Sequence, residues 1–154
     1  MPLPKPMNNI ETRFFEAKDF NFRAIEEEGK RFLEGHASVF ETKSRMLLEN
    51  GKTFTEQIMR GAFDSVLVDP QLDTIFNFNH DRNKIIARTK SGTLSLKSDE
   101  RGLFFRAEIP TGVSYAEDVY TLVKRGDLFS NSFAFSVNPQ DVEWSRDEDG
   151  NRLR

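Results

Sequence analysis

The sequence predicts an α+β domain built mainly on antiparallel sheet. Several stretches alternate apolar with polar residues or are rich in phenylalanine and β-branched residues, which is typical of half-buried strands. Two shorter stretches have helical spacing instead. Three of the strands follow one another across short polar turns, which indicates sequential pairing. The expected strands cover residues 20–24, 30–40, 74–80, 84–97, 103–109 and 131–137, and the expected helices cover 62–68 and 114–125.

The chain of 154 residues fits a single domain. A domain of this size buries roughly 68–70% of its unfolded surface, so it can hold a core without disulfide bonds. Residues 1–12 contain Pro2, Pro4 and Pro6, which favour a flexible leader. We therefore expect a leader over 1–12, without a catalytic role, and one folded domain over 13–154.

The expected elements of the first half are separated by turn and loop signals. Residues 26–29 (Glu-Glu-Glu-Gly) suit an exposed turn between the first two strands. Residues 41–55 form a polar loop, and the helix over 62–68 stops before Pro70. Phe63 is expected to dock this short helix onto the sheet.

The next segment is expected to form three strands in succession. The strand 74–80 ends at His80 and turns at 81–83 into 84–97, which passes through 98–102 into 103–109. Residues of this last strand alternate in a half-buried pattern. A regular hairpin centred on residue 100 would place Glu108 opposite Gly92.

The second helix and the strand after it have the clearest boundaries. Ser114 and Glu117 have the spacing of a capping box, and Gly126 is a natural helix stop. In the strand 131–137 that follows, Ser132 and Ser136 face one way, while Phe133, Phe135 and Val137 face the other. Residues 145–151 form a turn with only three residues after it, so a hairpin there would lack its return strand and the chain looks truncated.

Composition excludes several classes of function. A formal net charge of −3 with a pI near 5.5 gives no basic footprint for nucleic acid. No apolar run approaches the ~20 residues that span a bilayer, and the N-terminus lacks the apolar core of a signal peptide. With no cysteine and only two histidines, we expect neither a metal nor another cofactor.

A serine and a histidine on separate strands suggest a nucleophile and its base. Histidine has an unperturbed pKa of ~6.5 and can take the proton of a serine hydroxyl near neutral pH. His80 and Ser132 are the candidates, although Ser130 and Ser136 compete for the role of nucleophile. On spacing alone His80 also fits a turn histidine that bonds a backbone carbonyl, and Ser132 fits a small residue on a crowded strand face.

Several separated segments resemble the prohead, or head maturation, serine proteases of tailed bacteriophages. They run in order from about residue 20 to residue 144, and the ordered set is specific although each segment alone is weak. The segments are Gly35-His36-Ala37-Ser38-Val39-Phe40, Glu56-Gln57-Ile58, Gly61-Ala62-Phe63-Asp64, Asn79-His80-Asp81, Ser91-Gly92-Thr93-Leu94-Ser95-Leu96, Asp99-Glu100-Arg101-Gly102-Leu103, Ala107-Glu108-Ile109-Pro110, Arg125-Gly126-Asp127-Leu128 and Ser132-Phe133-Ala134-Phe135.

The resemblance implies that His80 and Ser132 are the catalytic pair. It also implies a fold similar to that of the herpesvirus assemblins, with a β-barrel-like core and peripheral helices. The expected activity is that of a phage serine endopeptidase that cleaves scaffold and capsid-protein segments, and itself, inside the assembling prohead in the host cytoplasm. Self-association is compatible with this reading. The alternative is a capsid-assembly module that binds scaffold or capsid protein without cleaving it.

The chain departs from the family pattern at its end. Family members usually continue past the position of Arg154 into a further strand with an acidic residue and then a Pro-Ala pair. By analogy with the assemblins, that region carries the third triad member and the oxyanion donors, and a chain without it would keep both side chains yet turn over slowly. The third role therefore stays unassigned. Each acidic residue considered for it is poorly placed: Asp81, Asp99, Glu100 and Glu108. His36 is conceivable if its strand neighbours that of His80, although it also fits a satisfied histidine of the barrel.

Overall fold

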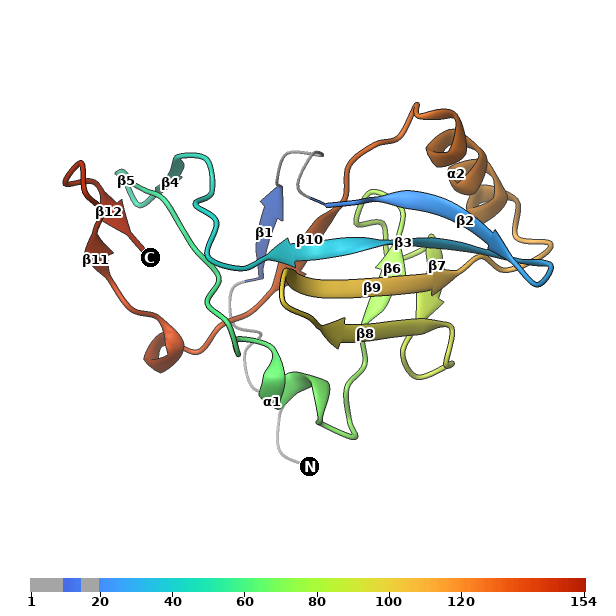
Figure 1. The fold of residues 1–154 in the computed structure, drawn as a ribbon, viewed down its shortest axis with the longest axis horizontal. Helices are drawn as coiled ribbons and strands as arrows, with labels where there is room; N and C mark the ends of the chain where they lie inside the picture. The colour runs from blue at the N-terminus through green and yellow to red at the C-terminus, as the bar shows by residue number, and fades with distance from the viewer. Residues whose placement is uncertain (1–9, 15–19) are drawn as a thin grey trace.

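The centre of the molecule is a four-stranded antiparallel sheet in the order β2-β3-β9-β8. The structure is a computed structural model, and it describes residues 10–14 and 20–154 (Figure 1). The strands of this sheet are β2 (Arg23–Glu27), β3 (Lys30–Val39), β9 (Gly102–Glu108) and β8 (Leu94–Ser98). A β-bulge between His36 and Ser38 interrupts the register of β3 with β9.

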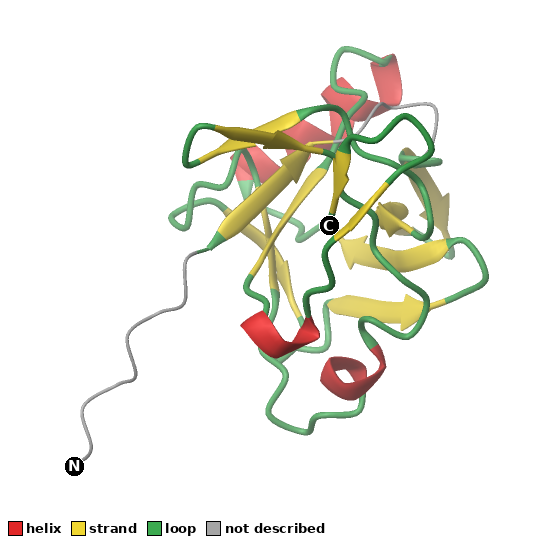
Figure 2. Ribbon diagram, turned by 90° about the vertical axis from the view of Figure 1, so that its left-hand side faces the viewer, coloured by secondary structure: helices red, strands yellow, loops and turns green. Residues whose placement is uncertain are grey.

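The other strands of the described residues form two-stranded antiparallel pairs around this sheet. They are β1 (Glu11–Phe14) with β10 (Ser132–Phe135), β4 (Leu47–Glu49) with β5 (Lys52–Phe54), β6 (Ile75–Asn77) with β7 (Ile85–Arg88), and β11 (Ser145–Arg146) with β12 (Arg152–Leu153). The helical segments are α1 (Asp64–Leu67), α2 (Ser114–Arg125) and the 3-10 turn η2 (Pro139–Asp141), and they lie at the periphery of the strands (Figure 2).

This architecture confirms the mainly antiparallel α+β prediction. The described strands do not close into a barrel, because the ladders are interrupted and the smaller pairs stand as separate sheets. The expected β-barrel-like closure is therefore not found, and likeness to the assemblins stays a prediction.

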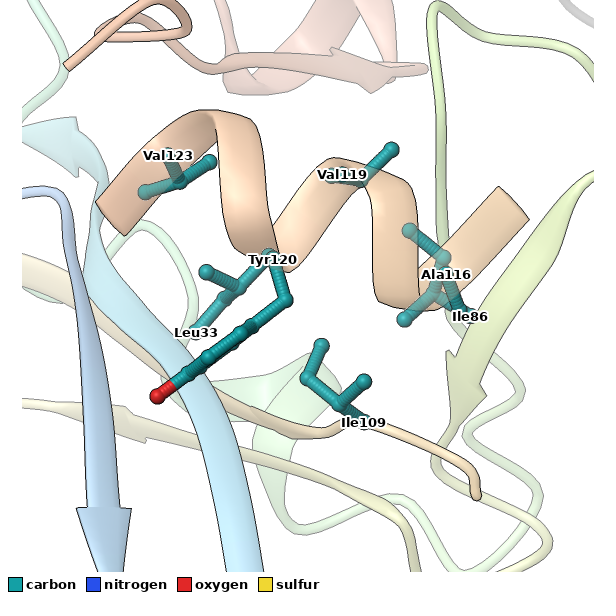
Figure 3. Close-up of a cluster of buried hydrophobic side chains, with 7 residues drawn as sticks. All are labelled: Leu33, Ile86, Ile109, Ala116, Val119, Tyr120 and Val123. Carbon is teal, nitrogen blue, oxygen red and sulfur yellow. The ribbon is translucent and has the colours of Figure 1, made fainter. Parts of the chain in front are cut away.

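Helix α2 covers one face of the central sheet and builds the largest apolar cluster. Its buried residues Ala116, Val119, Tyr120 and Val123 recur at helical spacing on one stripe. Figure 3 shows this stripe over Leu33 of β3, which is 0% exposed, together with Ile86 and Ile109. Packing of this stripe against the sheet fixes the start of the segment that leads to β10.

The ends of α2 agree with the prediction at one end only. Gly126 ends the helix in the left-handed region, with φ 86°, as expected. At the other end the N-cap is Val113 and no side chain caps the helix, so the predicted capping box of Ser114 is wrong. The reason is that Glu117 accepts hydrogen bonds from the backbone N–H of Gly112 and from Arg31 instead.

Two predicted strands are shorter than expected. The strand predicted over 74–80 stops at Asn77, and His80 lies in the turn after it. The strand predicted over 84–97 is divided into β7 and β8 by a turn that contains Gly92 at φ 72°. In β8 and β9, Leu94 pairs with Ala107, and the N–H of Glu108 donates to the carbonyl of Thr93, so Glu108 does not lie opposite Gly92 as predicted.

Both ends of the chain carry strands that the sequence did not indicate. Glu11 and Thr12, assigned to the leader, lie in β1, while residues 1–9 fall outside the described residues. The turn after β11 does have a return strand, β12, so the expected loss of that strand is wrong. This strand is only two residues long, and the turn pattern alone gave no sign of it.

Candidate active site

The structure brings His80 and Ser132 into direct contact. The Nε2 atom of His80 lies 2.5 Å from the Oγ atom of Ser132, although the two residues are 52 positions apart. Ser132 is the first residue of β10, and His80 lies in the turn between β6 and β7. A serine hydroxyl at this distance can donate its hydrogen to the imidazole, which is the arrangement that a nucleophile and its base require.

The turn that carries His80 is held in an unusual backbone conformation. Asn79 and His80 have positive φ values of 52° and 56°, in the left-handed region that most residues avoid. The turn is closed by backbone hydrogen bonds from Asp81 to Phe78 and from Lys84 to Asp81. The carboxylate of Asp81 accepts the backbone N–H of Asn83, so this candidate for a third catalytic role stabilises the turn itself.

Ser132 is placed by contacts on both sides of it in the chain. Asn131 donates through Nδ2 to the backbone carbonyl of His36 at 3.1 Å, which ties the start of β10 to the bulge of β3. The strand then pairs with β1, with Ser132 opposite Phe14. Ser130 and Ser136, which compete with Ser132 in the sequence, lie just outside β10, and both are exposed.

His36 has a different partner. Its ring is buried, and its Nε2 atom lies 2.8 Å from Oδ2 of Asp99. Burial alone would raise the pKa of Asp99, but hydrogen bonds from the backbone N–H of Gly102, from the His36 ring and from the backbone N–H of Arg101 outweigh it and lower the pKa. His36 and Asp99 therefore form a structural pair that joins β3 to the turn between β8 and β9.

The other acidic candidates are also engaged outside the His80 turn. Glu108 lies 3.3 Å from Nζ of Lys30 across the sheet. Glu100 belongs to the turn between β8 and β9, where its backbone carbonyl accepts a hydrogen bond from Arg60. These contacts do not supply a third member for the pair of His80 and Ser132.

The pair lies on the wall of a large cavity. The cavity has a volume of about 1800 Å³, and its lining includes His80, Ser132, Thr12 and Phe63. Small-molecule sites usually measure roughly 300–1,000 Å³, so this space is larger than a typical small-molecule site. Phe63 packs between Phe40 and Phe133, with ring centroids 6.1 Å from each, and so docks the segment of α1 as predicted.

Neither a metal cluster nor a membrane helix is present in the part of the chain that the structure describes. Within residues 10–14 and 20–154, no group of three or more His, Cys, Asp or Glu side chains is placed to hold a metal ion. Within the same ranges no helix is long and apolar enough to cross a bilayer.

A hydrogen-bonded serine and histidine, contributed by separate elements at the wall of a wide cleft, are the central parts of a serine hydrolase site. The chain belongs to the caudovirus prohead serine protease family, whose model matches residues 18–154. It is 27% identical over 132 residues to the prohead protease of Enterobacteria phage HK97. The match covers 86% of this chain and 53% of that protein, so the chain spans about half the length of its curated relative. No solved structure is detectably similar.

Proposed function

We propose that this chain is a serine endopeptidase in which Ser132 is the nucleophile and His80 the general base. The observation that carries the proposal is the 2.5 Å contact between Ser132 Oγ and His80 Nε2. Membership of the prohead serine protease family supports it, since the range that the family model matches, residues 18–154, contains both residues.

The proposed reaction follows from this contact. With its own proton on Nδ1, His80 accepts the hydrogen of Ser132 at Nε2 while Oγ attacks the carbonyl carbon of the substrate peptide bond. His80 then gives this proton to the leaving amine, and the carbon–nitrogen bond breaks to leave an acyl-enzyme. Water hydrolyses the ester by the reverse sequence of proton transfers and frees Ser132.

The substrates we propose are extended segments of scaffold and major capsid protein, and of the protease itself. The cavity volume of about 1800 Å³ supports a polypeptide substrate. The HK97 relative is named a prohead protease, which supports action inside the assembling prohead of the infected cell. The substrates and this location are proposals for the whole protein to which the chain corresponds.

The test is the intact mass of the purified chain over time, alone and with the capsid protein of the same phage. We expect fragments to accumulate with time, to be lost in Ser132→Ala and in His80→Gln, and to persist in Ser130→Ala, which is the matched control. If Ser136→Ala alone abolishes cleavage, the assignment of the nucleophile is wrong.

The same experiment addresses the alternative of an assembly module. Such a module would bind capsid or scaffold protein, and the binding would be equal for the wild-type chain and for Ser132→Ala. Unchanged masses together with equal binding in size-exclusion chromatography would contradict the peptidase proposal and favour the module.

A further inference from the structure

The short strand β1 lies directly beside the strand that carries Ser132. The backbone of Phe14 is opposite Ser132, and Arg13 is opposite Phe133. Since partners in an antiparallel ladder share a face, Thr12 lies on the same face as Ala134 and Ser132. Thr12 also lines the cavity that contains Ser132 and His80. The first strand of the described chain is therefore a wall of the candidate active site, and it precedes residues 18–154, which the family model matches.

A buried ion pair anchors β1 from its other face. Arg13 donates from Nε to Oε1 of Glu56 at 2.5 Å and from Nη2 to Oε2 at 2.9 Å. Arg13 is 8% exposed and Glu56 is 5% exposed. The guanidinium also lies 5.3 Å from the ring centroid of Phe135 in β10. The side chain of Arg13 thus joins β1, the strand β10 that carries Ser132, and the segment that contains Glu56.

Glu56 is itself held in place by hydrogen bonds of its own backbone and of the neighbouring residue. Its backbone N–H donates to Oγ of Ser44 at 2.9 Å, and its carbonyl accepts from the N–H of Ser44 at 2.8 Å. The neighbouring Gln57 donates its N–H to the carbonyl of Arg154 at 3.0 Å. Glu56 therefore has little freedom to move with Arg13. Its fixed position determines where Arg13, and with it β1, lies.

These contacts indicate that β1 is a fixed part of the site and not a cover that a substrate displaces. Moving β1 away would take from buried Glu56 the arginine that binds both of its carboxylate oxygens, and would leave it only Arg154, whose Nη1 lies 3.2 Å from Oε2, which is unfavourable.

Resting on the proposed function, we propose that Arg13 is a positioning residue of the active site. Through Glu56 it fixes β1, and the ladder of β1 with β10 holds Ser132 within reach of His80. It touches neither substrate nor reacting atoms, and it acts by keeping the hydroxyl and the imidazole at hydrogen-bonding distance.

The first measurement is the rate at which a fluorophosphonate probe labels Ser132 in the purified chain. We expect Arg13→Ala to lower this rate about 10- to 100-fold, because a displacement of about 1 Å at a reacting group can cost that much. Arg13→Lys should recover only part of it, since an ammonium cannot fork both carboxylate oxygens.

The matched control is Arg31→Ala. Arg31 also joins distant segments, through Glu117 at 3.0 Å and through the ring of Tyr120, but it lies on the α2 side of the sheet. We expect this variant to lose stability in urea denaturation and to label at a rate close to that of the wild-type chain.

The second measurement does not depend on activity. The chain has only two histidines, so ¹⁵N-labelled imidazoles give separate ring signals for His36 and His80. Ser132→Ala is expected to shift the His80 Nε2 signal, and Arg13→Ala should shift it in the same direction while leaving His36 unchanged. A general loss of structure would move both signals.

The outcomes separate the two proposals. If the wild-type chain neither labels at Ser132 nor shows a His80 signal that responds to Ser132→Ala, the proposed catalytic pair fails. If the wild-type chain passes both tests but folded Arg13→Ala labels as fast as Arg31→Ala, or faster than wild type, the positioning role of Arg13 is overturned. A faster rate would mean that β1 covers the serine.

Discussion

Replacement of Leu33 by alanine tests the packing of α2 on the central sheet. Leu33 is 0% exposed and lies beneath the apolar stripe of the helix (Figure 3). The change removes three carbon atoms, and at about 0.8 kcal/mol for each buried methylene group the transfer contribution alone is about 2.4 kcal/mol. The void that remains adds to this loss, so we expect the free energy of unfolding to fall by about 3–5 kcal/mol.

The measurement is urea denaturation followed by far-ultraviolet circular dichroism and by the fluorescence of Trp144. Trp144 packs on Phe54 with ring centroids 5.2 Å apart, so it reports on a different part of the molecule from the helix. Coincident transitions and an unchanged dependence on urea are expected for a loss of stability without a change of mechanism.

The control is Leu48→Ala, the same chemical change at a side chain that is 72% exposed. It should change the free energy of unfolding by no more than about 0.5 kcal/mol. Equal losses in the two variants would refute the assignment of the cluster around Leu33 as the main core.

Two further predictions concern backbone packing and pH. Gly102→Ala would place a Cβ atom 1.9 Å from the carbonyl oxygen of Ser38, so β3 and β9 must separate and we expect a loss of about 3 kcal/mol in thermal unfolding. Gly92→Ala, with φ 72° and nothing within 4 Å of the added atom, should lose only about 1 kcal/mol, and equal losses would contradict the clash. The hydrogen bond from Arg88, together with the charges of Arg88 and Lys90, lowers the pKa of Asp73 from 3.8 to about 2. Because the pKa of Asp73 is lower in the folded chain than in the unfolded one, this carboxylate contributes stability that is present above pH ~4 and is lost as the pH falls toward about 2. Arg88→Ala should therefore raise the pKa of Asp73 in a carboxyl NMR titration. It should also reduce the loss of stability between these pH values. An unchanged titration would show that this pair is not formed in solution.

The sequence predicted the elements in which local signals and tertiary packing agree. Helix α2 has an apolar stripe at helical spacing and Gly126 at its end, and both features appear in the structure. The alternation around Ser132 likewise predicted the faces of β10, since a strand has period two whatever its partners are.

The features that the sequence did not predict depend on local backbone conformation or on contacts between residues far apart in the chain. Residues 76–79 (Phe-Asn-Phe-Asn) alternate across the observed end of β6, so the pattern did not show that the strand stops at Asn77 or that His80 adopts a positive φ. The proximity of His80 and Ser132 rested on the family resemblance, because periodicity places side chains on faces without saying which faces meet.

The partners of charged residues were the least predictable features. Arg13 and Glu56 are 43 positions apart, and His36 and Asp99 are 63 apart. A single sequence has no signal that matches one carboxylate with one cation over such separations. The segment Glu56-Gln57-Ile58 stood out only through the resemblance, and Arg13 lay at the boundary of the expected leader.

The ion pair between Glu11 and Arg154 has a consequence for the timing of biosynthesis. Arg154 donates to the two carboxylate oxygens of Glu11 at 2.6 and 2.8 Å across a separation of 143 residues. At about 5–20 residues per second, a ribosome adds Glu11 to the chain roughly 7 to 29 seconds before it adds Arg154. A nascent chain therefore completes the support of β10, the strand that carries Ser132, only after translation has passed residue 154.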